Sequence, residues 1–192
     1  MSQAGPADSV PRRHVVIPSP VGELTLVAAG GALAGVYLED PGYPPSRSSL
    51  GAPGDPAARP FAATASQLAA YFSGQRTDFD LPLVLAGTPF QQRVWSALRC
   101  IPYGTTVSYG QLARRLGMPR ASRAVGHANA RNPISIIVPC HRLIGTDGSL
   151  TGYGGGLDRK RFLLDLEQQI SAGPAGARSQ GGRQHSPVSQ RG

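Results

Sequence analysis

The residues with the greatest chemical potential lie together in the segment Pro139-Cys140-His141-Arg142. A cysteine becomes a nucleophile when its thiolate is favoured, and a neighbouring cation or proton acceptor has this effect. The apolar run 134–138 before it is rich in β-branched residues, which predicts a short buried strand. Pro139 should end that strand because proline has no amide hydrogen to donate. A structural buried cysteine is the alternative, and the neighbouring histidine and arginine disfavour it.

A glutamate far along the chain offers a partner for this segment. The last helix is expected at 157–170, and helical spacing places Glu167 within its apolar stripe. A carboxylate on an inward face needs a hydrogen-bonding partner, for which His141 is the obvious candidate. The sequence therefore predicts a relay from Cys140 to His141 to Glu167. A water is expected between the first two, because adjacent residues of an extended chain point apart.

The quartet 139–142, followed by Gly152-Tyr153-Gly154-Gly155-Gly156-Leu157, resembles the O6-alkylguanine-DNA alkyltransferases. The resemblance runs from about residue 88 to about 167, with a weaker part from about 14 to 40. It implies a DNA repair methyltransferase that moves the alkyl group of O6-alkylguanine, and of O4-alkylthymine, from duplex DNA to its own Cys140. The damaged nucleotide would first be flipped out of the helix. The product would be a thioether, so each molecule would act once.

The same resemblance implies roles for four further residues. Arg123 would enter the base stack, Tyr109 would crowd the phosphate and promote rotation, and Tyr153 would hydrogen-bond the departing guanine. Asn132 would be a hinge between a DNA-binding helix and the active-site loop. From residue type alone, Tyr109 is equally an ordinary aromatic near a helix start, and an Asn before a proline is a common turn signal.

Two short basic helices, expected at 109–116 and 121–130 with a turn at Gly117, are typical of a helix-turn-helix. Ser108 and Gln111 form a capping box for the first of them. The second helix has a face of small side chains, which suits close approach to a minor groove. Its small residues are Ala121, Ser122, Ala124, Gly126, Ala128 and Ala130.

We expect Ser122, Ala124 and Gly126 to lie against DNA. Dense packing of the same helix in a core is the alternative, and Arg123 and His127 oppose it because charged and polar side chains resist full burial.

Charge is distributed unevenly along the chain, whose net charge is +8. No aspartate or glutamate occurs in 81–146, a stretch that predicts a polyanionic partner rather than an ordinary solvated surface. The eight arginines within it are Arg93, Arg99, Arg114, Arg115, Arg120, Arg123, Arg131 and Arg142. A basic surface that serves only solubility is the alternative.

The pattern as a whole predicts an α/β (α+β) fold. A small N-terminal antiparallel sheet with a helix should precede a C-terminal winged helix-turn-helix-like alkyltransferase domain, as the resemblance implies. Strands are expected at 14–17, 23–28 and 32–38, and helices at 61–72 and from Thr88 to Cys100. The expected divisions are a flexible arm at 1–12, a scaffold domain at 13–80 with a flexible loop at 41–60, a DNA-binding and catalytic domain at 84–170, and a disordered basic tail at 171–192.

The two cysteines and four histidines show no zinc spacing, and no phosphate loop or dinucleotide motif occurs, so we expect neither metal nor cofactor. Cys100 is expected to be a small buried structural thiol. No run approaches the ~18 apolar residues that span a bilayer, and no signal peptide is visible, which predicts a cytoplasmic protein without a membrane partner. The expected partner is double-stranded DNA containing O6-alkylguanine, bound by a monomer, with cooperativity on DNA left open.

Two other functions fit part of the pattern. A thiol hydrolase could use Cys140 and His141, but it explains neither the acid-free stretch nor the small-residue helix. A non-enzymatic DNA module, such as a winged-helix regulator or an alkyltransferase-like damage sensor, explains those two features. Such sensors lack the reactive cysteine, which is present here.

Overall fold

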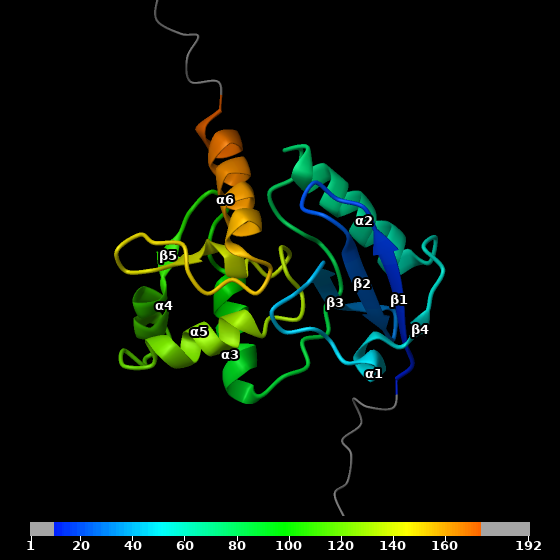
Figure 1. Cartoon of the computed structure of the whole chain (residues 1–192), viewed down its shortest axis with the longest axis horizontal. Coiled ribbons are helices and arrows are strands. Elements are labelled where there is room, and N and C mark those ends of the chain that lie inside the picture. The colour runs from blue at the N-terminus through cyan, green and yellow to red at the C-terminus, as the bar shows by residue number, and fades with distance from the viewer. Residues whose placement is uncertain (1–9, 174–192) are drawn as a thin grey trace, which may run out of the picture.

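The computed structural model describes residues 10–173, and its N-terminal part is built on a four-stranded sheet (Figure 1). The strands lie in the order β3-β2-β1-β4, with the first three antiparallel and β4 parallel to β1. They are β1 (Arg12–Ile17), β2 (Leu24–Ala29), β3 (Ala32–Leu38) and β4 (Ala52–Pro53). Gly30 and Gly31, both with positive φ, make the tight turn between β2 and β3. The predicted antiparallel sheet is confirmed.

The sheet differs from the expectations at its edges. β1 begins at Arg12, two residues before the strand expected at 14–17, and the rest of the expected arm, residues 1–9, lies outside the described part of the chain. The segment 41–60 holds more regular structure than the expected loop, namely α1 (Arg47–Leu50) and β4. The Ser46 side chain caps α1 by accepting from the Ser49 amide, and β1 offers β4 a free edge. Proline and serine here mark turns between short elements.

Helix α2 (Arg59–Phe72) packs on the sheet through its apolar face. Its buried residues include Phe61, Leu68 and Tyr71, at the spacing of one helical face. The chain then crosses to β3, where Leu33 exchanges backbone hydrogen bonds with 82–84. α2 and the sheet therefore form a layer against which the C-terminal part packs.

The C-terminal part consists mainly of helices, and its helix-turn-helix is confirmed (Figure 1). The helices are α3 (Pro89–Arg99), α4 (Tyr109–Arg115), α5 (Ser122–Ala130), the 3-10 helix η2 (Cys140–Arg142) and α6 (Leu157–Ala172). β5 (Val107–Ser108) pairs in parallel with β6 (Leu143–Ile144). Trp95 Nε1 donates to the Ala128 carbonyl at 2.9 Å and joins α3 to α5. No helix within 10–173 is long and apolar enough to cross a membrane.

The run 134–138 does not form the predicted strand. Ile134 makes a single bridge to Val36 of β3, after which the chain turns repeatedly. Ile136 has φ 71°, in the left-handed region that a β-branched residue ordinarily avoids. The prediction was wrong because the run donates to β3 only through the Ser135 amide, which bonds to the Val36 carbonyl, while local turns and the Asn132 side chain take up its other hydrogen bonds.

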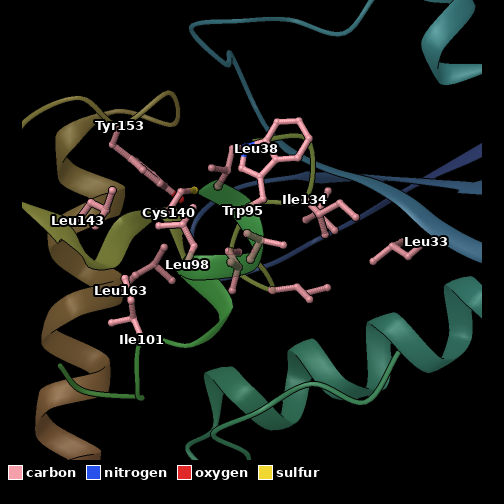
Figure 2. Close-up of a cluster of buried hydrophobic side chains, with 14 of the residues drawn as sticks. Leu33, Leu38, Trp95, Leu98, Ile101, Ile134, Cys140, Leu143, Tyr153 and Leu163 are labelled. Atoms are coloured by element: carbon pink, nitrogen blue, oxygen red, sulfur yellow. The ribbon is translucent and has the colours of Figure 1, made fainter. Parts of the chain in front are cut away.

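One hydrophobic cluster joins both parts of the chain (Figure 2). Leu33 and Leu38 of the sheet, Leu98 of α3 and Leu163 of α6 belong to it, and each is at least 96% buried. Cys140 is a member of the same cluster. The nucleophile candidate is thus held by the main core rather than by a surface loop.

The cap of α3 gives a stability prediction. Thr88 Oγ1 accepts from the Gln91 amide at 3.3 Å, and Gln91 Oε1 accepts from the Thr88 amide at 2.9 Å. Thr88→Ala removes one of these bonds and should lower the free energy of unfolding by about 1 kcal/mol. Urea denaturation measures it. Thr88→Ser, which keeps the hydroxyl, is the control, and an equal loss in both variants would contradict the assignment.

Candidate active site

Cys140 is the first residue of η2, and its side chain is almost fully enclosed, with 4% exposed. Its amide donates to the Val138 carbonyl at 2.8 Å. Its carbonyl accepts from Nδ2 of Asn129, a buried residue of α5, at 3.2 Å. The backbone on both sides of the sulfur is therefore fixed, and one of its anchors belongs to the helix-turn-helix.

Asn132 organises the turn that leads to the cysteine. Its Nδ2 donates to the Val138 carbonyl at 2.8 Å, and its Oδ1 accepts from the Ile134 amide at 3.1 Å. The residue itself lies two positions after the last residue of α5, Ala130. Its side chain thus lies between α5 and the active-site segment, the position expected of a hinge.

His141 and Glu167 meet as predicted. His141 Nε2 lies 2.9 Å from Glu167 Oε1, and both side chains are fully buried. Burial lowers the pKa of His141, against the opposing effect of the carboxylate, and so favours the neutral imidazole. The carboxylate accepts the Nε2 proton in that state, which leaves Nδ1 as an acceptor. Nδ1 has no partner within residues 10–173.

The Glu167 carboxylate accepts from three further groups. Arg142 donates through Nε to Oε2 and through Nη2 to Oε1, each at 2.9 Å. The Gly104 amide donates to Oε2 at 3.0 Å, and the Tyr71 hydroxyl donates to Oε1 at 2.8 Å. Burial alone would raise the pKa of Glu167, but the His141 and Arg142 contacts outweigh it and hold this pKa at about 2. The carboxylate stays ionised.

Sequence reasoning did not find Lys160, which is fully buried. Its Nζ donates to the carbonyls of Leu143 and Thr151. Burial lowers its pKa to about 8, and a negative charge on Cys140 would oppose that shift. A usable signal was its position seven residues before Glu167, which places both on the inward face of α6.

The thiol of Cys140 is neutral at rest. Burial raises its pKa, while a hydrogen bond from Asn132 and the charge of Lys160 act in the opposite direction. The protein around the sulfur therefore supplies a cation and a hydrogen-bond donor without ionising the free thiol.

Two tyrosines lie beside the sulfur. Tyr153 is 8% exposed, its ring is directed toward Cys140, and its hydroxyl has no partner in the described chain (Figure 2). The Tyr109 hydroxyl donates to the Thr151 carbonyl at 2.9 Å, and burial raises the pKa of Tyr109 to about 12. Gly152 has φ 65°, and a Cβ there would lie 2.6 Å from the Tyr109 hydroxyl, so this close approach requires glycine.

Helix α5 has one buried and one open face. Its buried residues are Val125, Ala128 and Asn129. The opposite side of the helix is open, so the helix as a whole is not buried in a core. The residues of that opposite side are Arg123, Ala124 and His127, which are exposed, and Ser122 and Gly126, which are partly exposed.

A cavity of about 510 Å³ lies beside this open face. Ser122, Arg123 and Gly126 line it together with Tyr109, whereas Ala124 is not among its lining residues. Tyr43, from the segment after β3, also borders it, and the Arg131 guanidinium lies 5.4 Å from the centre of the Tyr43 ring. Both parts of the chain contribute to this hollow.

Two expectations about surface residues need correction. Cys100 is exposed rather than buried, because it follows the last residue of α3 at the end of the apolar stripe. Seven of the eight arginines in 81–146 are exposed, but Arg142 is buried against Glu167. In residues 10–173 no three histidine, cysteine or acidic side chains are placed to hold a metal ion.

Comparison with known proteins identifies the family. Residues 89–169 match the family described as 6-O-methylguanine DNA methyltransferase, DNA binding domain, and residues 13–85 match its ribonuclease-like domain. A Mycobacterium tuberculosis protein named methylated-DNA–protein-cysteine methyltransferase is 55% identical over 152 residues, which cover 79% of this chain and 90% of that protein. The chain belongs to the 6-O-methylguanine DNA methyltransferase family.

Further relatives of this methyltransferase family agree. A protein of the same name from Methanosarcina acetivorans is 59% identical over 107 residues, covering 56% of this chain and 69% of that protein. The crystal structure of Mycobacterium tuberculosis OGT in complex with DNA has a TM-score of 0.77 and 52% identity, and the match covers 82% of this chain and 94% of that one. The fold predicted from the sequence is that of the family.

The ionised Glu167 gives a prediction for acid denaturation. Its folded pKa of about 2 lies below the ordinary glutamate pKa of 4.5, so its stabilising contribution is complete above pH 4.5 and is lost as the pH falls toward 2. That contribution is about 3 kcal/mol at most. Glu167→Gln should flatten the dependence of unfolding free energy on pH in this window. Glu23→Gln, at an exposed site, is the control, and parallel curves for the parent and Glu167→Gln would contradict the prediction.

Proposed function

We propose that this protein repairs alkylated DNA by moving the alkyl group from O6 of guanine in a duplex to the sulfur of its own Cys140. The observation that carries the proposal is an enclosed thiol accompanied by two buried groups that have no partner within residues 10–173: Nδ1 of the adjacent His141, and the hydroxyl of Tyr153, whose ring is directed toward Cys140. Buried polar groups ordinarily have partners, and these two are an acceptor for the thiol proton and a donor for a departing base. The names of the relatives support this reading.

The transfer is a displacement at the alkyl carbon. The sulfur of Cys140 forms a bond to that carbon as the bond between the carbon and guanine O6 breaks. The thiol proton passes through a water to Nδ1 of His141, and the ionised Glu167 stabilises the imidazolium. Guanine leaves with the electron pair of the broken bond and accepts a hydrogen bond from Tyr153. It takes up the proton that the imidazolium releases, so that His141 ends neutral. The buried Lys160 stabilises the thiolate as it forms.

The enclosure of the sulfur requires the substrate base to leave the duplex. Cys140 lies behind α5, and the O6 of a stacked, paired guanine cannot reach it. In the proposal, the small residues Ser122, Ala124 and Gly126 let α5 approach a minor groove closely. The exposed Arg123 fills the gap in the base stack, and Tyr109 crowds the phosphate.

Asn132 is proposed as the hinge that keeps α5 and the cysteine turn in register. We further propose that O4-alkylthymine is a second substrate, since it presents an alkyl group on a comparable exocyclic oxygen. The protein acts as a monomer in the cytoplasm, and it acts once because a thioether has no easy hydrolytic exit.

Stoichiometry tests the proposal directly. With excess duplex containing O6-methylguanine, methyl transfer should reach a plateau at one per protein, with the added mass on the Cys140 peptide. Cys140→Ala should abolish transfer while duplex binding persists. Cys100→Ser, which changes the exposed cysteine, should transfer normally. Continued turnover after the first equivalent, or methyl on Cys100, would disprove the self-alkylation mechanism.

The assignment of Arg123 predicts a split between two substrates. Arg123→Ala should slow repair of duplex O6-methylguanine roughly tenfold to a hundredfold, since unstacking a base costs a few kcal/mol. It should leave the reaction with free O6-benzylguanine nearly unchanged, provided that the pocket admits this base. The second-order rate constants for both substrates give the answer, and equal losses on both would show that Arg123 shapes the pocket instead.

Arg114→Ala is the matched control for this split, because Arg114 is exposed on the preceding helix and carries the same charge. If Arg114 contacts a phosphate, its loss should weaken binding to any duplex and reduce the salt dependence by about one unit.

A further inference from the structure

One donor to Glu167 comes from the N-terminal part of the chain. Tyr71 lies on α2, is fully buried, and donates from its hydroxyl to Glu167 Oε1 at 2.8 Å. The same Oε1 lies 2.9 Å from Nε2 of His141. A residue 96 positions away in the sequence therefore shares the oxygen that orients the catalytic imidazole.

Packing alone does not account for this hydroxyl. The Tyr71 ring packs edge-on against Phe72 at 5.4 Å and against Tyr103 at 5.9 Å, as a phenylalanine could. The neighbouring Tyr103 has a buried hydroxyl with no partner in the described chain, so this aromatic cluster tolerates an unpaired phenol. The hydroxyl of Tyr71, in contrast, is directed at one carboxylate oxygen.

We propose that Tyr71 is a positioning residue for alkyl transfer, which holds Oε1 of Glu167 where His141 donates its Nε2 proton and so keeps Nδ1 available to Cys140. The inference rests on the proposed self-alkylation of Cys140 and extends it. The N-terminal part would then contribute to the chemistry as well as to the scaffold.

The charge balance around His141 gives the direction of the effect. The hydroxyl of Tyr71 takes up part of the negative charge of Oε1. Without it, the carboxylate attracts the imidazole proton more strongly, and the pKa of His141 rises. The other titratable groups that face this pair are Cys140 and Arg142 of η2, Lys160 of α6, and Tyr103 of the segment between α3 and β5. All four of these side chains are still present in Tyr71→Phe.

The test compares Tyr71→Phe with Tyr103→Phe, each of which removes one phenol hydroxyl from the same aromatic cluster. The rate of methyl transfer from duplex O6-methylguanine is measured from pH 5 to 9, with the melting temperature of each variant. In Tyr71→Phe the acid limb of the profile should move up by roughly half to one pH unit, so that the rate at any pH on that limb falls about three- to tenfold. Tyr103→Phe should keep the parent profile.

A double-mutant cycle decides whether Tyr71 acts through Glu167. Tyr71→Phe should have no further effect on the profile when Glu167 is already replaced by glutamine, because the shared oxygen no longer carries charge. An equal slowing in both backgrounds would overturn the proposal. So would a lower melting temperature with an unmoved acid limb, since that is the behaviour of a residue that only packs.

A measurement that needs no substrate separates this inference from the function on which it rests. NMR titration of the His141 ring in the full chain should give a higher pKa in Tyr71→Phe than in the parent. An unchanged pKa would refute the positioning role even if transfer is normal, whereas absence of transfer in the parent would refute the proposed function alone. If Tyr71→Phe does not fold, 3-fluorotyrosine at position 71, a stronger donor that keeps the ring, should lower the His141 pKa instead, and no change would refute the role.

Discussion

The structure depends on a single buried negative charge. Glu167 is fully enclosed, and an unpaired carboxylate in that position would cost several kcal/mol. Its donors come from α2, from the segment before β5, and from η2, so these elements must meet at one point for the chain to fold. The geometry that activates Cys140 is thus also the geometry that satisfies the core. A protein built in this way cannot relax its active site without weakening its stability.

Local patterns in the sequence predicted the features that depend on neighbouring residues, namely the helix starts and the face on which a helical side chain lies. The capping boxes at Thr88 and Ser108 set the starts of α3 and α4, and the inward position of Glu167 was sufficient to pair it with His141. The segment 134–138 was predicted wrongly, because its composition is that of a strand while local turns and the Asn132 side chain take up most of its hydrogen bonds. Asn132 satisfies the groups that a neighbouring strand would otherwise have satisfied, and the left-handed Ile136 cannot be read from its residue type.

The burial of two cations could not be predicted from the sequence, and the physical reason is the same for both. Arg142 and Lys160 have the residue type of a solvated surface, and only the fold shows that they are enclosed. With Glu167 ionised and His141 neutral, the pocket holds one positive charge in excess. A thiolate at Cys140 would neutralise it. The charge balance of the pocket therefore favours ionisation of the sulfur, while burial opposes it and holds the resting thiol neutral.

Helix α5 lies between the surface that meets a partner and the sulfur. Arg123 and Ala124 face outward, while Asn129 on the opposite side donates to the carbonyl of Cys140. Asn132, just beyond the helix, holds the turn before the cysteine. The side-chain amides of Asn129 and Asn132 thus fix the position of Cys140 relative to this helix. The distance between the open face of α5 and the sulfur is therefore set by those two amides, and not by a mobile surface loop.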